Sequence, residues 1–339
     1  MMRKTVFFIF FFVIFLLFVI PIKAEETIRV GYFPNITHSQ AVIGIANGAF
    51  QKALGDNVKI ETKIFNAGPS VIEAIFAGAL DLAYVGPNPA INGYIKSDGK
   101  ALRIIAGATS GGAALVVRLD AGINKIEDFH RKRIASPQLG NTQDVFLRAW
   151  LRGNGFLFKE NGGDVEVVSI ANPDQLTLFL KKEIDAAWTV EPWVSRLVKD
   201  GKGKIFIDEA SLWPNGDFVT THVIVTKKFL EKHPEIVKNW IRAHVELTRW
   251  INNNPNEAKA ILNQEIKKMT GQTLSQEVLD EAFSRIKITY DPIRKSLFTS
   301  AQQAFEQGFL GKEKPDLSGI YALDILNEIL KEKNLPQID

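Results

Sequence analysis

Residues 66–92 read NAGPSVIEAIFAGALDLAYVGPNPAIN, and this stretch decides the fold. Gly68 and Pro69 suit the start of a helix, because proline at the first helical position loses no hydrogen bond. The apolar run LDLAYV is typical of a buried parallel strand, and the turn Gly86-Pro87-Asn88-Pro89 follows it. The stretch therefore predicts one helix–strand unit between two tight turns. Glycine in such turns allows close backbone approach, and a helix N-terminus offers free N–H groups to a small anion.

The same unit occurs again in residues 173–192, PDQLTLFLKKEIDAAWTVEP. Twelve residues separate Pro69 from Asp81, and twelve also separate Pro173 from Asp185. Two interpretations follow from this repeat. The units are ordinary parts of one α/β domain, or they belong to two related lobes that point helix N-termini and strand ends at a shared cleft. Ligands of open α/β sheets bind at the carboxyl ends of the strands.

The first 24 residues have the form of a secretory signal peptide. Arg3 and Lys4 precede an apolar run from Val6 to Ile20, and the small residue Ala24 follows. The run is somewhat short for a membrane span, and an uncleaved anchor is the alternative interpretation. We expect cleavage near Ala24, which leaves about 315 residues, enough for two lobes of ordinary domain size.

Composition excludes several classes of protein. The net charge of +3 comes from Arg3, Lys4 and Lys23 in the leader, which leaves 38 basic residues against 38 acidic ones. Such a balance indicates no nucleic-acid partner and no membrane-surface partner. The chain has no cysteine, so disulfides, thiolate metal sites, thiol nucleophiles and a lipid-modified cysteine are excluded. Export without a lipid anchor predicts a periplasmic protein, with free secretion as the alternative.

The order of expected elements suggests a discontinuous first lobe. We expect strands at 27–33, 58–65, 165–170 and on both sides of a Gly111-Gly112 break within 101–118, and helices at 40–55, 234–252, 255–268, 275–286, 292–309 and 317–332. Segments 101–118 and 218–230 are the expected crossings between lobes. The prediction is a signal peptide at 1–24, lobe one at 25–112 and 222–339, the latter part with the C-terminal helices, and lobe two at 113–221.

Five blocks of sequence carry a family resemblance: GYFPNITHSQAVIG, FNAGPSVIEAIFAGALDLAYVGPNPAINGY, IASPQLGNTQDVFLRAWL, AAWTVEPW and LWPNGDFVTTHVIV. Together they resemble the substrate-binding proteins of ABC importers for aliphatic sulfonates, nitrate and taurine. The resemblance covers essentially the whole mature chain. It implies an α/β two-lobe periplasmic-binding-protein fold of type II, with two hinge crossings and a helical C-terminal part. It also implies a monomer that closes around one small organic anion, with an aliphatic sulfonate the first choice, and delivers it to a membrane ABC permease.

Related branches of this fold supply the alternatives. One branch binds pyrimidine or flavin vitamin precursors, which would stack on aromatic side chains such as Tyr32, Phe33, Tyr84 and Trp188. Another consists of thiamin-pyrimidine synthases with a cysteine-rich iron site, which a chain without cysteine lacks. The sequence also contains no nucleophile elbow, zinc-protease pattern or phosphate-binding loop. We therefore expect a binding protein with no catalytic residue, cofactor or metal, the enzymatic alternative being an acid/base pair of Glu191 with His38.

Polar residues and glycines at the turns, helix starts and crossings are the expected ligand contacts. In lobe one these are Asn35, His38, Gly68, Pro69, Ser70, Gly86, Asn88, Thr109 and Ser110. In lobe two and the return crossing they are Gly140, Asn141, Thr142, Trp188, Glu191 and Thr221.

Each of these residue types also has a purely structural interpretation. Asn35 and Asn88 stabilise turns, Asn141 or Thr142 caps a helix, and Trp188 forms a cleft wall or ordinary core. For Glu191, contact with a ligand amine, support of a hinge strand and contact with lobe one on closure are all open. None of the motifs contains Arg or Lys, so an anion would be held by neutral donors and helix N-termini. That arrangement suits a sulfonate and leaves room for a neutral ligand.

Overall fold

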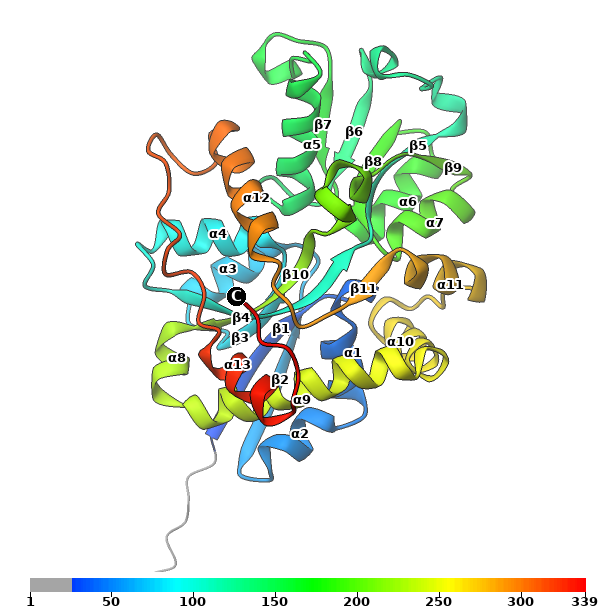
Figure 1. Ribbon diagram of the computed structural model, residues 1–339. Coiled ribbons are helices and arrows are strands. Elements are labelled where there is room, and N and C mark those ends of the chain that lie inside the picture. Colours follow the sequence, from blue (N-terminus) through cyan, green and yellow to red (C-terminus); the bar gives the residue numbers. More distant parts are fainter. Residues whose placement is uncertain (1–25) are drawn as a thin grey trace, which may run out of the picture.

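The computed structural model describes residues 26–339 and contains two sheets. The predicted signal peptide at 1–24 lies outside the described residues. Figure 1 shows the sheets one above the other, each flanked by helices. We call the part around the six-stranded sheet lobe one and the part around the five-stranded sheet lobe two. The expected mixed α/β class is confirmed.

The strands of lobe one run in the order β11-β4-β10-β3-β1-β2. Their bounds are β1 (Glu26–Tyr32), β2 (Val58–Ile64), β3 (Leu82–Val85), β4 (Leu102–Gly111), β10 (Val219–Thr226) and β11 (Ile286–Ile288). Strand β1 pairs in parallel with β2 and β3, while β10 is antiparallel to β3 and β4. All four residues of β3 are buried, as expected for an apolar run within a parallel pair.

Lobe two has the strand order β7-β6-β8-β5-β9. The bounds are β5 (Ala113–Arg118), β6 (Arg133–Ser136), β7 (Glu166–Ser169), β8 (Ala186–Val190) and β9 (Gly203–Asp208). Alternate residues of β5 enter different cores: Leu115 and Val117 pack on one face of the sheet, and Ala114 and Val116 on the other. This alternation follows from the two-residue period of a strand, and it leaves both faces of the sheet covered.

The described residues also form thirteen α-helices. In lobe one they are α1 (Ser39–Ala46), α2 (Ala49–Leu54), α3 (Gly68–Phe76), α4 (Pro87–Lys96), α8 (Lys227–Lys232), α9 (Pro234–Asn253), α10 (Pro255–Thr270), α11 (Gln276–Ser284), α12 (Arg294–Glu306) and α13 (Asp324–Glu332). In lobe two they are α5 (Thr142–Gly153), α6 (Asn172–Leu180) and α7 (Trp193–Lys199). Within residues 26–339, no helix combines the length and the apolar character needed to cross a bilayer.

The predicted break at Gly111-Gly112 is confirmed as the passage from β4 to β5. Both glycines have positive φ, 79° and 77°, a conformation that costs glycine nothing and other residues much more. A side chain at Gly112 would also meet Ile286, whose Cγ2 lies 2.4 Å from the Cβ position. The chain returns to lobe one through β10. The two sheets are therefore joined by extended segments that run through the middle of the molecule (Figure 1).

Four local predictions were wrong in part. The expected helix at 317–332 begins only at Asp324, as α13. The expected helix at 40–55 is two helices, because Gly48 adopts a left-handed φ of 73° between them. The expected helix at 275–286 forms but ends at Ser284, and Ile286 begins strand β11, in which Ile286 and Ile288 alternate with Lys287 in the two-residue period of a strand. The expected turn at Gly86-Pro87-Asn88-Pro89 begins helix α4, with Gly86 at the N-cap. Prolines are tolerated there because the first N–H groups of a helix have no intrahelical partner.

Candidate functional site

A small cavity lies where the two lobes meet. It has a volume of about 20 Å³. Its walls come from the residues that follow the carboxyl ends of β1, β2 and β3, from the starts of α4, α5 and α6, and from the first part of β10. The lining residues are Phe33, Asn35, Thr37, His38, Asn66, Gly86, Asn141, Thr142, Gln143, Asn172, Val190, Thr220 and Thr221.

Several helices begin at this cavity. Gly86 is the N-cap of α4, Asn141 is the N-cap of α5, and Asn172 is the first residue of α6; all three line the cavity. Helix α3 starts at Gly68, two residues after the lining residue Asn66. The N-terminus of a helix carries a partial positive charge. The cavity is therefore surrounded by donors and positive helix ends, although no lysine or arginine lines it.

Direct hydrogen bonds close the lobes over the cavity. The backbone N–H of Gly68 donates to Asn141 Oδ1 at 3.1 Å, and the N–H of Asn88 donates to Thr142 Oγ1 at 3.4 Å. In both cases an oxygen of lobe two accepts from the first turn of a lobe-one helix. These N–H groups have no partner within their own helices. Asn141 Oδ1 and Thr142 Oγ1 therefore lie where the oxygens of a bound anion could accept hydrogen bonds from the same two N–H groups.

Side-chain contacts also cross between the lobes near the cavity. Trp193 Nε1–H at the start of α7 donates to Asn35 Oδ1 at 2.9 Å, with both residues buried. Ser70 Oγ lies 3.4 Å from Gln138 Oε1. Together with the two backbone contacts, these bonds define a closed arrangement of the lobes.

One polar atom of the cavity has no protein partner. Thr221 is fully buried and lines the cavity, and its Oγ1 makes no hydrogen bond among the described residues. Buried hydroxyls are nearly always paired. An unpaired hydroxyl on the cavity wall indicates that the site is built for a polar ligand.

His38 lies on the cavity wall as a neutral ring. It stacks on Phe33 with ring centroids 4.4 Å apart, and the backbone N–H of Phe33 donates to its Nδ1 at 3.3 Å. Burial lowers the pKa of His38 to about 3. Since Nδ1 accepts a hydrogen bond, the single ring proton sits on Nε2. His38 therefore offers the site a neutral N–H donor and no charge.

Glu191 faces the hinge and does not line the cavity. Its carboxylate accepts from the N–H and the hydroxyl of Ser195, at 3.1 and 3.0 Å. Arg285, between α11 and β11 in lobe one, forms ion pairs with Glu191 at 3.0 Å and with Asp208 at 2.9 Å. Burial raises the pKa of Glu191 to about 7. Of the roles left open by the sequence, the structure shows contact with a lobe-one group.

Trp188 lies in the core of lobe two and not in the cleft wall. Its ring is fully buried, and its Nε1–H donates to Glu209 Oε2 at 2.8 Å. Tyr84 holds the matching position in the first repeat, and its hydroxyl lies 2.9 Å from His244 Nδ1 inside lobe one. Side chains alternate along a strand, and in both lobes this aromatic residue faces the core. The expectation that Trp188 forms a cleft wall is corrected accordingly.

The other predicted residues divide into three groups. The cavity wall contains Asn35, His38, Gly86, Asn141, Thr142 and Thr221. At the adjoining helix starts lie Gly68, Pro69, Ser70 and Asn88. The remaining three do not line the cavity: Thr109 Oγ1 donates to the carbonyl of Thr37, Ser110 pairs within the sheet, and the N–H of Gly140 donates to Asp144.

Sequence reasoning missed the wall residues Thr37, Asn66, Gln143, Asn172, Val190 and Thr220. Asn172 had a usable signal, because it precedes Pro173 as Gly68 precedes Pro69 in the first repeat. The others depend on how the lobes meet. No cluster of three or more histidine, aspartate and glutamate side chains suited to a metal ion occurs in residues 26–339.

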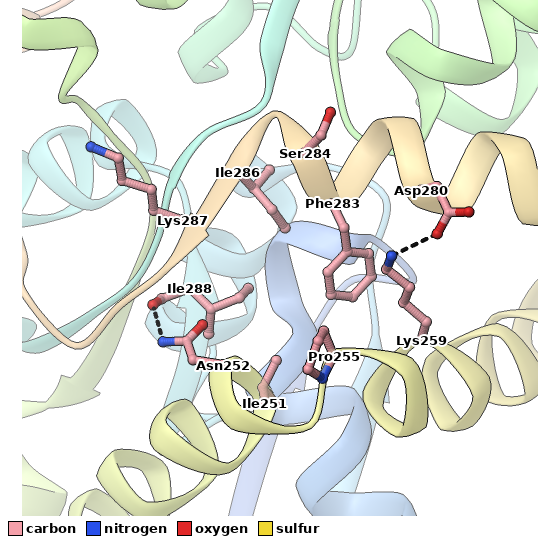
Figure 2. Close-up of a pocket in the computed structure, with 10 residues that line it drawn as sticks. All are labelled: Ile251, Asn252, Pro255, Lys259, Asp280, Phe283, Ser284, Ile286, Lys287 and Ile288. Carbon is pink, nitrogen blue, oxygen red and sulfur yellow. Dashed lines mark hydrogen bonds and ion pairs between the residues drawn. The ribbon is translucent and has the colours of Figure 1, made fainter.

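A second, larger pocket opens on the outside of lobe one, between the α9–α10 corner, α11 and β11. Its volume is about 520 Å³. Figure 2 shows Lys259 extended toward Asp280, at 2.6 Å, and Asn252 bonded to the carbonyl of Ile288. These polar groups are already paired, and every lining residue belongs to lobe one. The cavity between the lobes is therefore the better candidate for the functional site.

Comparisons with known proteins agree with this arrangement. Residues 23–264 match the model of the NMT1-like family. The taurine-binding periplasmic protein of Escherichia coli (strain K12) is 26% identical over 278 residues, which cover 79% of this chain and 83% of the relative.

Two solved structures show the same fold. The alkanesulfonate-binding protein SsuA from Xanthomonas axonopodis pv. citri, bound to MOPS, superposes with a TM-score of 0.70 and 17% identity, over 85% of this chain and 96% of that one. The periplasmic nitrate-binding protein NrtA from Synechocystis PCC 6803 gives a TM-score of 0.71 and 17% identity, over 92% and 90%. The expected two-lobe fold of periplasmic binding proteins is thereby confirmed.

Proposed function

Because this chain belongs to the NMT1-like family, we propose that it is the extracytoplasmic substrate-binding protein of an ABC importer. On this proposal it captures a small organic anion, in the first place an aliphatic sulfonate, and delivers it to a membrane permease. The proposal includes export to the periplasm, cleavage of the leader near Ala24 and action as a monomer. The two lobes would be the units that move, with the expected boundary between 221 and 222 moved to the start of β10 at Val219, because β10 belongs to the sheet of lobe one.

The observation that carries the proposal is the set of oxygen acceptors at the helix starts. Asn141 Oδ1 accepts a hydrogen bond from the N–H of Gly68, and Thr142 Oγ1 accepts one from the N–H of Asn88. The oxygens of a sulfonate are acceptors of the same kind and carry the negative charge that helix N-termini favour. The unpaired hydroxyl of Thr221 supplies a further donor. A sulfonate is weakly basic, so neutral donors hold it without any proton transfer.

Capture requires the lobes to part and close again. A cavity of about 20 Å³ holds about one water molecule, so a sulfonate enters only when the cross-lobe contacts open. A ligand that touches both lobes would stabilise a liganded closed form, wider than the closed form in this structure, relative to the open form. The extended passages at Gly111-Gly112 and β10 are the places where this motion would occur.

A thermal-shift panel tests the proposal. The purified protein is heated with alkanesulfonates, taurine, nitrate, bicarbonate, and pyrimidine and flavin precursors in turn. A ligand that binds only the folded state raises the melting temperature, and we expect the alkanesulfonates to do so. A response confined to nitrate or bicarbonate would replace sulfonate by an inorganic anion. A response to the vitamin precursors alone would contradict the anion proposal.

A further inference from the structure

The cavity between the lobes is polar but carries no charged side chain. Among residues 26–339, no aspartate, glutamate, lysine or arginine lines it. The one titratable side chain on the wall is His38, which is neutral because burial lowers its pKa to about 3. The wall therefore holds asparagine, glutamine, threonine and a neutral imidazole as its polar side chains. Any formal charge inside the closed site must come from the ligand.

The carboxylates nearest in sequence to the wall are already engaged and face away from it. Glu191 follows the wall residue Val190, but it pairs with Arg285 and Ser195 at the hinge. Asp144 lies in the first turn of α5 and is fully buried.

All the partners of Asp144 lie outside the cavity. It accepts from Ser136 Oγ at 2.7 Å and from the N–H of Gly140 at 2.9 Å, and it pairs with Arg148 at 3.1 Å. None of these side chains lines the cavity. A positively charged group inside the cavity would consequently find no carboxylate.

The N-termini of the helices at the wall also favour a negatively charged ligand over a positively charged one. The positive ends of α4, α5 and α6 meet at the wall, so they attract an anion and repel a cation. The closed lobes also remove water from the ligand. An ammonium group buried without a counter-ion loses its hydration and gains nothing comparable in return.

We propose that this site accepts simple sulfonates and rejects sulfonates that also carry an ammonium group. The inference rests on the proposed function, since it concerns the same cavity, and it adds the chemical class of the ligand. A monoanion with an apolar or hydroxyl tail fits the uncharged wall, whereas a zwitterion such as taurine would bury its ammonium group unpaired.

Titration calorimetry with three ligands of equal length tests the inference. Propane-1-sulfonate, isethionate and taurine share the sulfonate and end in methyl, hydroxyl and ammonium groups. We expect the first two to bind and taurine to bind about 100-fold more weakly at pH 7, as the burial of an unpaired charge implies. Taurine binding within about tenfold of propane-1-sulfonate would overturn the inference and leave the proposed function standing. Failure of all three sulfonates would overturn the proposed function itself.

A variant separates charge from shape. Asn172 lines the cavity, and its Oδ1 accepts from Thr189 Oγ1 at 2.9 Å. Asn172→Asp keeps that acceptor and adds a carboxylate of the same size. We expect the ratio of taurine affinity to propane-1-sulfonate affinity to rise about tenfold or more. Asn154→Asp, at the exposed end of α5, is the matched control and should leave the ratio unchanged. An unchanged ratio in Asn172→Asp would count against the role assigned to charge.

Discussion

Asn141 of lobe two accepts a hydrogen bond through its Oδ1 from the backbone N–H of Gly68, at the start of a lobe-one helix, at 3.1 Å. The two residues are 73 positions apart in the chain. The contact holds the lobes closed and occupies one of the donors that the proposed anion would use. The Asn141 side chain and the proposed ligand therefore compete for the N–H group of Gly68. Substitution of Asn141 tests this relationship.

Asn141→Ala should open the protein in the absence of ligand. The substitution removes one cross-lobe hydrogen bond, worth about 1 kcal/mol, so the closed population falls and the radius of gyration in solution scattering rises. Helix α5 loses little stability, because the only bond from the Asn141 side chain to its own helix start is the one that Nδ2 donates to Gln143 Oε1, and it makes no capping bond to the helix backbone. Asn154→Ala at the other end of α5 is the control. Equal radii of gyration for the parent and Asn141→Ala would show that this bond does not set the closed population.

Trp193→Phe should weaken ligand binding with little loss of stability. It keeps an aromatic ring but removes the Nε1–H that donates to Asn35 across the lobes. This bond uses none of the N–H groups assigned to the ligand, so we expect it to form again in the liganded closed form, and its loss lowers the apparent affinity by about five- to tenfold. Calorimetric titration with propane-1-sulfonate measures the effect.

Trp188→Phe is the matched comparison for Trp193→Phe. Its Nε1–H donates to Glu209 inside lobe two, so the loss should appear in the melting temperature and not in the affinity. If Trp188→Phe lowered affinity as much as Trp193→Phe, the placement of Trp188 in the core would be the wrong explanation of its role.

Gly86→Ala should prevent full closure while each lobe still folds. The φ of Gly86 is −67°, which any residue adopts. A Cβ there would lie 2.4 Å from Thr142 Oγ1 of lobe two in the closed form, and the neighbouring atoms must give way. We expect a loss of affinity of about tenfold or more at an unchanged melting temperature of the unliganded protein. Gly153→Ala, which meets no atom within 4 Å, is the control and should bind like the parent.

Acid should destabilise the protein through its buried histidines. Burial lowers the pKa of His38 to about 3 and that of His222 and His244 to about 4. Below the ordinary value of about 6.5 the unfolded chain binds protons that the native state does not. The free energy of unfolding should therefore fall as the pH drops from 6.5 toward 4, by up to about 1.4 kcal/mol per pH unit for each histidine.

Two buried glutamates give the free energy of unfolding the opposite pH dependence. Burial raises the pKa of Glu191 and Glu209 to about 7, so the native state holds protons that the unfolded state releases above about 4.5. The contribution of Glu191 and Glu209 to the free energy of unfolding falls as the pH rises toward and through 7. Denaturant unfolding at several pH values should show a maximum of stability near pH 6.5. His244→Gln should reduce the slope of the free energy of unfolding against pH, between about pH 4 and 6.5, by about the contribution of one proton.

Arg285→Leu should destabilise the folded protein strongly. Arg285 is the cation beside the buried Glu191, whose pKa burial raises to about 7, so above pH 7 its removal leaves a buried carboxylate unpaired, which costs about 3–5 kcal/mol. The double variant with Glu191→Gln removes both charges and should recover most of that loss in denaturant unfolding. Equal stability of the single and double variants would show that the two side chains are not coupled.

The sequence by itself determined the local structure around the repeat and the family. Pro69 and Pro173 predicted helix starts because proline at the first turn loses no hydrogen bond, and both helices begin there. Gly111 and Gly112 predicted a break, and both adopt positive φ. These features depend on neighbours close in the chain, so a single sequence contains the information. The resemblance to binding proteins of ABC importers rested on whole blocks of sequence, and the match to the NMT1-like family confirms it.

Only the tertiary structure decided which polar residues meet. Asn141 reaches Gly68, and Trp193 reaches Asn35 over 158 positions, contacts that exist because two separately formed lobes come together. The sequence left Trp188 open as a cleft wall or as ordinary core, and only the packing of lobe two selects the core. The role of Glu191 was likewise open until Arg285, 94 residues later in the chain, was placed against it. Local pattern specifies helices and strands, whereas the chemistry of a cleft depends on how distant segments are brought together.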